Sequence, residues 1–537
     1  EKAIALMNGV QNQGVFSTGK HFPGHGDTAI DSHLGLPTVT SSREHLDVVE
    51  LYPYKRMFDE GLVSVMVGHL DVPSLEFRQN FPSSISYNVV TNLLQKELEF
   101  DGLIFTDALN MKGISKYRKP GELELDALLA GNDILLFPEN VPLAVETISK
   151  AYQENALSEE RLALSVKKIL KYKFKAGLNH YKSIAIPNLI SDINPVENEA
   201  LQYQLYENAT TVLKNGGDIL PIKDLVNNKI AYVKLGDDTN ASFISTLKKY
   251  ADVTEVTAPT IDSLNVKLKE FSTVIVGYHK ADKPWKNNDF TSNELIWLQE
   301  IARNNRVIVD VFAKPYSLLP LANYSEIEGL IVSYQNNDIA QQVGAELIFG
   351  AIEAKGKLPV SINDIFKVND GLSTENLNRL GFTAPENVGM SSEKLTKIDA
   401  LVQKAIAGKM APGVQVLVAR KGKVIYQKAF GSYTYDSDVK VTNETIFDIA
   451  SVSKIVGTLP NVMQQYDQQK VNLESTLGSM VPIFANSDKK DIRFKELLSH
   501  YAGLVSWVPF YKATLDAKEK PLAKYYRKIA DSQFSKQ

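Results

Sequence analysis

Residues 20–33 read Lys20-His-Phe-Pro-Gly-His-Gly-Asp-Thr-Ala-Ile-Asp-Ser-His33 and directly follow a short apolar run at 14–18. Similar runs recur at 63–67, 102–106 and 133–137. Amphipathic, helix-like stretches at 44–61, 86–100 and 121–130 separate these runs, and two more follow the last run, at 141–156 and 159–172. Short apolar runs of this kind are typical of strands buried in a parallel sheet. Their alternation with helices predicts an α/β fold built on a parallel sheet or a barrel.

Polar residues cluster where these predicted strands end. Lys20 and His21 follow the first run, His69 follows the second and Asp107 follows the third. In a (β/α)8 barrel the chemistry sits at the carboxyl ends of the strands, so this placement favours a TIM-type barrel. Such a barrel needs about 250 residues, and four strands cannot close it. We therefore expect residues 1–185 to form only the C-terminal half of a barrel.

Two further units follow the barrel-like segment. Residues 186–370 alternate strands and helices and predict a second α/β sandwich domain, and residues 371–392 are rich in Asn, Ser, Thr, Gly and Pro and predict a linker. Residues 393–537 predict a partial α+β domain with a hairpin turning at Lys421-Gly422. The strands expected in the second unit lie near 229–235, 272–278, 306–312 and 329–334.

The composition excludes several classes of protein. Lys and Arg total 59 against 63 Asp and Glu, a net charge of −4, which is not the basic balance of a nucleic-acid binder. No apolar run reaches the roughly 18 residues of a membrane-spanning helix. There is no cysteine, so the chain has no disulfide, thiol nucleophile or Cys-ligated metal. The first residue is Glu1, so we expect residues to be missing upstream, where a targeting signal would lie.

The histidine-rich loop admits three interpretations. His21, His25 and His33 could bind a metal with Asp27 or Asp31, but their spacing matches no closed zinc motif. The polar residues could instead only tie the loop to the barrel rim. The third interpretation is a glycan site, and the residues alone leave all three open.

The glycan interpretation has a physical basis in Asp31 and His33. Residues two apart in an extended segment point to the same side, so the carboxylate can approach the imidazole. That contact fixes the tautomer and stabilises the imidazolium, and the pair could give a proton to a leaving group and later take one from water. Asp107, at a strand end, could attack or stabilise an oxocarbenium ion, or could instead cap a helix.

Residues 20–33 together with 102–111 closely resemble the β-N-acetylhexosaminidases of glycoside hydrolase family 3, of the NagZ type. The resemblance extends over residues 1–370, because the second α/β unit, ending in Gly356-Lys-Leu-Pro-Val-Ser361, looks like the C-terminal domain of that family. It implies a retaining glycoside hydrolase that removes β-linked N-acetylglucosamine, with no metal and no cofactor.

The resemblance also assigns roles to five residues. It implies that Lys20 and His21 bind the sugar, that Asp107 is the nucleophile, that His33 is the acid/base and that Asp31 assists it. Some β-glucosidases of the family take their acid/base from the second domain, and the Asp31–His33 pair argues against that subgroup. A β-glucosidase nevertheless stays an alternative. So does a β-N-acetylglucosaminide phosphorylase, because a neutral His repels phosphate less than a Glu would.

A second motif lies at Ser451 and Lys454, three residues apart and hence neighbours on a helix. With Pro412-Gly-Val-Gln-Val-Leu-Val418 and Leu497-Leu-Ser-His-Tyr-Ala-Gly-Leu504, it resembles the serine β-lactamase and penicillin-binding-protein superfamily in its class C branch. That resemblance implies Ser451 as the acylated nucleophile and Lys454 as its base. No Tyr-x-Asn or Lys-Thr-Gly motif follows Ser451, so we expect only the front part of the domain.

Together these features predict a fragment of a two-enzyme fusion that acts on cell-wall sugars or muropeptides. We expect a carbohydrate substrate, no nucleic acid and no transmembrane segment in this chain. A periplasmic or cell-envelope location is favoured over a cytoplasmic one. A scaffold that binds peptidoglycan without turnover is the non-enzymatic alternative.

Overall fold

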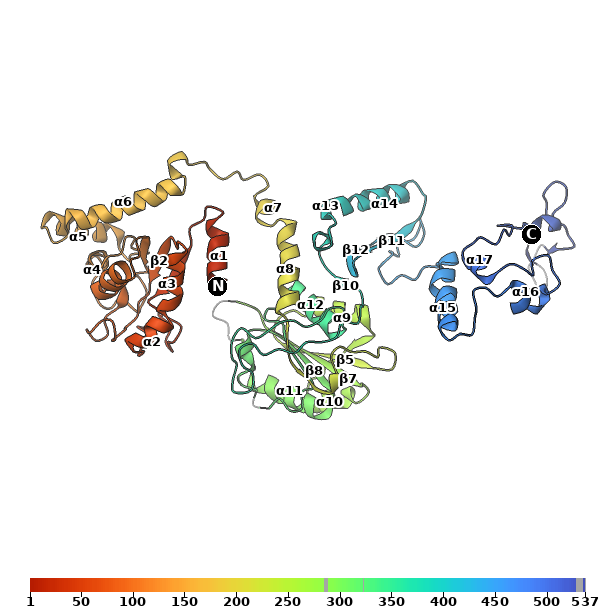
Figure 1. Ribbon diagram of the computed structural model, residues 1–537, viewed down its shortest axis with the longest axis horizontal. Helices are drawn as coiled ribbons and strands as arrows, with labels where there is room; N and C mark the ends of the chain where they lie inside the picture. The colour runs from red at the N-terminus through yellow and green to blue at the C-terminus, as the bar shows by residue number, and fades with distance from the viewer. Residues whose placement is uncertain (284–287, 322, 528–534, 537) are drawn as a thin grey trace. The chain divides into compact units, whose positions relative to one another are not determined.

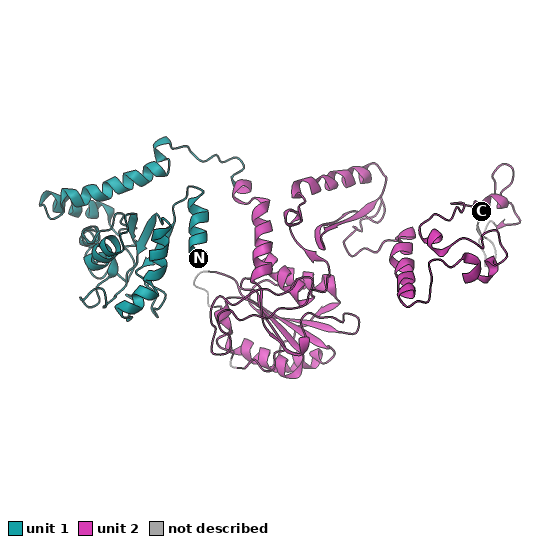
Figure 2. Cartoon of the chain, viewed as in Figure 1, with its two compact units in different colours: residues 1–189 teal, residues 190–537 magenta. Residues whose placement is uncertain are grey.

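The computed structural model describes residues 1–537 except 284–287, 322, 528–534 and 537. The chain divides into two compact units, residues 1–189 and 190–537 (Figure 2). Both are of the α/β type that the sequence predicts. Among the described residues, no helix is both long and apolar enough to span a membrane.

The first unit is built on a three-stranded parallel sheet in the order β1-β2-β3. The strands are β1 (Thr18–Phe22), β2 (Ser64–Val67) and β3 (Leu103–Thr106). Apolar side chains of these strands, such as those of Val65 and Ile104, are fully buried. Since all three strands run in the same direction, their carboxyl ends meet at one edge of the sheet.

Two of the four strands predicted for this unit are confirmed, and two predictions are wrong. Within the run at 14–18 only Thr18 belongs to a strand: α1 (Lys2–Gln11) ends just before the run, and Gly14, at φ 79°, donates its amide N–H to the carbonyl of Gln11. Strand β1 therefore starts at Thr18 and contains Lys20 and His21, which were expected beyond its end.

The run at 133–137 forms only a single bridge, between Ile134 and Phe105. The Asp133 side chain explains why, because its Oδ2 accepts the backbone N–H of Ile104 at 3.0 Å, where a backbone carbonyl would otherwise serve. The same carboxylate pairs with Lys168 at 2.6 Å and so ties the long helix α6 (Glu159–Lys175) to the sheet.

The helix expected over 44–61 is interrupted, so that α2 (Arg43–Val48) and α3 (Leu51–Asp59) are separated by Val49 and Glu50. The other helices expected in this unit are present. They are a π-helix at Asn88–Glu97, α4 (Glu122–Ala130), α5 (Val141–Gln153) and α6.

The second unit contains a six-stranded sheet in the order β4-β9-β8-β7-β5-β6. Its four predicted strands are confirmed as β5 (Ile230–Gly236), β7 (Thr273–His279), β8 (Val307–Phe312) and β9 (Gly329–Val332). The sequence missed β4 (Thr211–Asn215), which is antiparallel to β9, and β6 (Val253–Glu255).

Helices cover both faces of this sheet (Figure 1). One face carries α9 (Ala241–Tyr250) and α12 (Asp338–Ile348), with α8 (Val196–Ala209) packed on α12. The other face carries α10 (Ile261–Leu268) and α11 (Ser292–Asn304). The result is the α/β sandwich that the sequence predicts.

The predicted hairpin is confirmed as β11 (Gly413–Arg420) and β12 (Lys423–Gly431), which turn through Lys421 and Gly422 at positive φ. Two successive residues at positive φ are what a type I′ turn requires. Helices α13 (Ser392–Leu395) and α14 (Lys397–Ala407) precede the hairpin. The segment expected to be a linker is folded: its strand β10 (Gly381–Phe382) pairs in parallel with β12.

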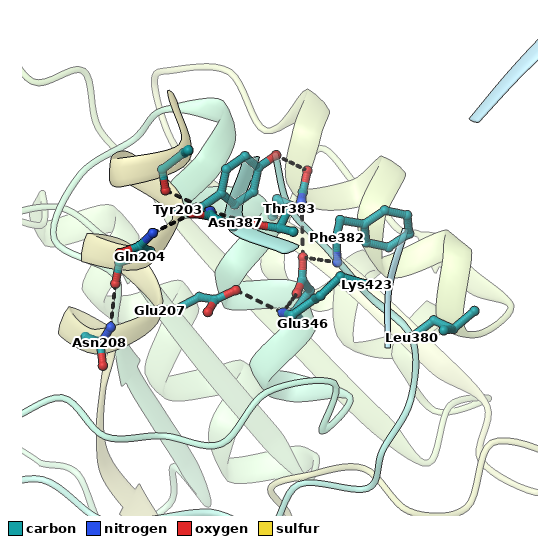
Figure 3. Close-up of polar contacts among 12 residues, drawn as sticks. Tyr203, Gln204, Glu207, Asn208, Glu346, Leu380, Phe382, Thr383, Asn387 and Lys423 are labelled. Atoms are coloured by element: carbon teal, nitrogen blue, oxygen red, sulfur yellow. Dashed lines mark hydrogen bonds and ion pairs between the residues drawn. The ribbon is translucent and has the colours of Figure 1, made fainter. Parts of the chain in front are cut away.

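A buried ion pair fixes this hairpin to the sandwich domain (Figure 3). Lys423, at the start of β12, lies 3.2 Å from Glu346 of α12 and 2.9 Å from Glu207 of α8. The Glu346 side chain is 0% exposed, and its second oxygen accepts the backbone N–H of Phe382 at 3.1 Å and an N–H of Gln342 at 3.1 Å. The carboxylate of Glu346 is thus shared between three segments of the chain.

Charge and burial oppose each other at this pair. Burial raises the pKa of Glu346, and Lys423 acts against that rise. Burial by itself would lower the pKa of Lys423, but Glu346 and Glu207 hold it above its ordinary value. Glu346 and Glu207 together thus keep Lys423 charged at this depth, and Lys423 offsets part of the cost of burying Glu346.

We expect Lys423→Met to lower the free energy of unfolding by about 3–5 kcal/mol, because it leaves Glu346 buried without its counter-ion. Adding Glu346→Gln to Lys423→Met should recover part of that loss. Denaturant titration of the full chain, followed by fluorescence, measures both effects. The control Lys428→Met breaks a pair with Asp399 that is largely solvent-exposed and should cost no more than about 1 kcal/mol. Equal losses for Lys423→Met and Lys428→Met would contradict the role given to the buried pair.

Candidate active site

His21 and Asp107 approach each other across the carboxyl edge of the first sheet. His21 lies near the end of β1 and Asp107 directly follows β3. The Nε2 atom of His21 is 3.7 Å from Oδ2 of Asp107. The other carboxylate oxygen of Asp107 accepts the backbone N–H of Ala108 at 2.8 Å. No helix begins at Asp107, since the next helix of the chain is α4, so the helix-cap interpretation is wrong.

His69 follows the central strand β2 and supports the segment that carries Asp107. Its Nε2 is 3.0 Å from the carbonyl oxygen of Ala108 and its Nδ1 is 2.7 Å from the hydroxyl of Ser84. A carbonyl can only accept, so Nε2 carries the proton. Burial lowers the pKa of His69, against the opposing effects of Ala108 and Asp107, so the ring is neutral and Nδ1 accepts from Ser84. The sequence indicated a polar residue here but no positioning role.

The expected contact between Asp31 and His33 is present. The Oδ1 atom of Asp31 lies 2.8 Å from Nδ1 of His33 and also accepts the backbone N–H of His33 at 2.9 Å. These two bonds, the backbone one foremost, hold the pKa of Asp31 below its ordinary value. An ionised Asp31 requires a proton on Nδ1, which makes Nε2 the nitrogen that can exchange a proton. The His33 side chain is 58% exposed.

The charges of these residues act on one another. Burial lowers the pKa of His21, Asp107 opposes that shift, and Lys20 and His33 add to it. His69 likewise responds to Asp107, His21 and His33. The structure therefore brings residues from β1, from the loop after it and from the ends of β2 and β3 into one electrostatic neighbourhood.

Beside His21 an open pocket of about 540 Å³ is lined by residues of β1, of the loop after it and of helices α2 and α3. Among them are Lys20, His25 and Glu50. The pocket includes Lys20 and His21, but Asp31, His33 and Asp107 do not line it.

The three-histidine metal interpretation is not supported. His25 bonds through Nδ1 to the hydroxyl of Thr28 at 2.6 Å, and His33 is engaged by Asp31. The rings of His21 and His25 meet edge to face with centroids 5.7 Å apart. Within residues 1–189, all of which the structure describes, these histidines do not converge as metal ligands.

In the second unit, the Ser451 and Lys454 side chains meet as expected. Lys454 donates from Nζ to Oγ of Ser451 at 2.9 Å. Both side chains are exposed and lie in short helical turns at Ala450–Val452 and Lys454–Thr458, which lead into α15 (Leu459–Asp467).

We expect His69 to keep its neutral, Nε2-protonated form between about pH 6.5 and pH 8, because burial lowers its pKa below the ordinary value and both ring nitrogens are engaged. Two-dimensional ¹H–¹⁵N NMR of the histidine rings measures this directly. A His69→Gln variant identifies the resonance. A ring that becomes doubly protonated within this range would refute the assigned hydrogen bonds.

Two segments of the chain match families of known proteins. Residues 2–172 match the glycosyl hydrolase family 3 N-terminal domain and residues 398–536 match the beta-lactamase family. Beta-hexosaminidase A of Pseudoalteromonas piscicida is 31% identical over 253 residues, which are 44% of this chain and 41% of that protein. The chain spans less than half the length of the curated relatives it matches.

Solved structures of glycoside-acting enzymes also resemble this chain in fold. A family 3 beta-N-acetylglucosaminidase from Paenibacillus sp. str. FPU-7 aligns at a TM-score of 0.56 and 27% identity, over 67% of this chain and 70% of its own. A beta-glucoside phosphorylase shares the fold at a TM-score of 0.59 and 21% identity, over 67% and 68% of the two chains. Residues 2–172 of this chain are thus a glycoside hydrolase family 3 N-terminal domain, and residues 398–536 belong to the beta-lactamase family.

Proposed function

We propose that the chain belongs to a retaining β-N-acetylhexosaminidase that removes β-linked N-acetylglucosamine from peptidoglycan fragments. Two observations carry the proposal: the Asp107 carboxylate at the end of β3, whose Oδ2 lies 3.7 Å from Nε2 of His21, and the contact between Asp31 and His33 in the loop after β1. N-acetylglucosamine is proposed as the sugar because the similar proteins are named beta-hexosaminidase and beta-N-acetylglucosaminidase. The proposal divides the chain into a barrel segment at 1–185, a sandwich domain at 186–370 and a serine domain at 393–537.

Asp107 is the proposed nucleophile. Its Oδ1 is held by the N–H of Ala108, which leaves Oδ2 facing His21 at the mouth of the sheet. In the first step Oδ2 attacks the anomeric carbon, and the bond to the leaving oxygen breaks as a glycosyl-enzyme forms. Lys20 and His21, which are adjacent in β1 and both line the pocket, are the proposed sugar-binding residues.

His33 is the proposed acid/base. Its Nε2 proton passes to the leaving oxygen in the first step, and the resulting neutral Nε2 takes a proton from water in the second. Asp31 holds Nδ1–H throughout and stabilises the imidazolium that the cycle requires. The exposure of His33 suits a residue that must meet both a leaving group and water.

A β-glucosidase and a phosphorylase of the same fold use the same first step. The phosphorylase would replace water by phosphate in the second step, and a neutral His33 would not repel that anion. The likeness to a beta-glucoside phosphorylase is a likeness of fold, so the substrate and the acceptor must be decided by assay.

We expect Asp107→Ala to lower turnover of a chromogenic β-N-acetylglucosaminide by at least about 10³-fold, because nucleophile loss removes the covalent route. His33→Ala should lose far less on a substrate with a good leaving group than on an alkyl glycoside, since only the poor leaving group needs the proton. Initial rates on both substrates, with and without phosphate, give the measurement.

Two exposed side chains serve as controls. Asp101→Ala removes a carboxylate at the opposite end of β3, and His180→Ala removes a histidine far along the chain. Both should keep normal rates. Preference for a β-glucoside, acceleration by phosphate, or near-normal activity of Asp107→Ala would each overturn the assignment.

We further propose that Ser451 is an acylated nucleophile of the serine domain, with Lys454 as its base. The 2.9 Å contact between Lys454 Nζ and Ser451 Oγ supports this, because the amine lies within hydrogen-bond reach of the hydroxyl group. A sugar-directed and an acyl-directed segment on one chain suit a substrate with both glycosidic and peptide bonds.

We expect a fluorescent penicillin to label the full chain at Ser451. Ser451→Ala should abolish the label, because no oxygen remains to form the acyl bond, and the exposed neighbour Ser453→Ala should keep it. Gel fluorescence and intact-mass spectrometry report the adduct. Absence of label on the unaltered chain would favour a segment that only binds peptidoglycan.

A further inference from the structure

We propose that Asp27, His45 and Glu50 form a binding site for a divalent transition-metal ion, separate from the residues of the proposed sugar chemistry. One ligand atom from each of the three side chains lies within 4.8 Å of those from the other two. The Nε2 atom of His45 is 3.8 Å from Oε1 of Glu50. These residues line the wall of the pocket that also holds Lys20 and His21.

The three ligands come from three different segments. Asp27 belongs to the loop after β1, His45 lies in α2, and Glu50 lies at the break between α2 and α3. The interruption of the expected helix at Val49 and Glu50 is what brings Glu50 opposite the loop. A continuous helix over 44–61 would not carry this bend, so the local structure itself creates the cluster.

Glu50 supplies the independent observation. Its side chain is only 8% exposed, and its buried Oε2 has no hydrogen-bond partner. A carboxylate this deep normally has its oxygens satisfied, because an unpaired buried charge is costly. A cation held between Glu50, His45 and Asp27 would compensate that charge.

The loop is also packed directly against the Glu50 side chain. A Cβ at Gly24 would lie 2.4 Å from Cγ of Glu50, so only a glycine allows the loop to approach this closely. Gly24 has a φ of 150°, a further reason for glycine at this position. Asp27, three residues later, is thereby held over the carboxylate that it would share an ion with.

The ligand set indicates the kind of ion. One imidazole and two carboxylates suit Zn²⁺ or Mn²⁺, whereas Ca²⁺ prefers six to eight oxygen ligands. Two ligands of one tetrahedral zinc ion lie roughly 3.3 Å apart, so the 3.8 Å between His45 and Glu50, and separations of up to 4.8 Å within the cluster, must shorten when the ion binds. Asp27 and His45 are exposed and can make this movement. The fourth position would hold water from the pocket.

The ion would act as a clamp. It would link the loop at 24–27 to α2 and α3, and this loop continues directly from the strand that presents Lys20 and His21. Its proposed role is therefore to hold the sugar-binding end of β1, and it takes no part in bond breaking.

The test is zinc binding by the full chain after treatment with a chelator and dialysis. Isothermal titration calorimetry with ZnCl₂ should show one saturable site, with MnCl₂ binding to the same site more weakly and MgCl₂ and CaCl₂ scarcely binding. Asp27→Asn, His45→Ala and Glu50→Gln should each weaken zinc binding at least about tenfold, since even outer-shell partners of metal ligands contribute about 10–100-fold. The melting temperature should rise with zinc in the unaltered chain and not in these variants.

Three controls make the result specific. Glu60→Gln alters an exposed carboxylate at the end of α3, and His180→Ala alters a distant histidine; both should bind zinc normally. Asp107→Ala should also bind zinc normally, which separates this site from the proposed catalysis. If the Glu50→Gln variant does not fold because Glu50 is buried, the zinc affinity of Asp27→Asn decides the test, since Asp27 is exposed and its substitution should leave the fold intact. Two results would overturn the proposal directly: no saturable zinc binding by the unaltered chain, or unchanged zinc binding by Asp27→Asn. A His21→Ala/His33→Ala double variant that loses zinc binding, while Asp27→Asn keeps it, would also overturn the proposal.

Discussion

The parallel pairing of β1, β2 and β3 is the constraint on which the candidate site depends. The register sets Phe22 opposite Val67 and Val67 opposite Thr106, so the three strands end at one level. His21, His69 and Asp107 therefore meet at one edge, although they are spread over 87 positions of the sequence. Without that register the backbone N–H of Asp107 would not reach the carbonyl of Val67, which it does at 2.9 Å. An antiparallel neighbour would send these side chains to opposite ends of the sheet.

The sequence predicts this sheet well where strands are buried on both faces. Runs at 63–67 and 102–106 consist mainly of apolar residues and were located to within a residue or two. β1 was misplaced because its residues Thr-Gly-Lys-His-Phe alternate in exposure and include two that face the site, so the adjacent apolar run at 14–18 was the stronger signal. A strand that carries polar functional side chains lacks the apolar run by which buried strands are predicted from a sequence.

Contacts between distant segments were the part that no local pattern could predict. Lys423 meets Glu346 and Glu207 from 77 and 216 positions away, and each of these residues alone has the sequence character of a solvated surface charge. Glu50 is similar, since a glutamate within an amphipathic stretch gives no sign that the helix breaks there. Asp31 and His33 could be paired from the sequence because they are two residues apart. Burial of a charge is a property of the tertiary structure.

The environments of the site residues separate their protonation states in the way that the proposed mechanism needs. Burial lowers the pKa of His21, so near neutral pH the ring beside Asp107 is uncharged and can donate a hydrogen bond without forming a strong ion pair with the nucleophile. At Asp31 the hydrogen bonds from His33 lower the pKa of the carboxyl group, so this carboxylate stays ionised. The proposed nucleophile Asp107 thus has a neutral histidine as its neighbour, and the proposed acid/base His33 has an ionised carboxylate. The same two residue types can serve opposite tasks because burial governs one pair and solvent exposure the other.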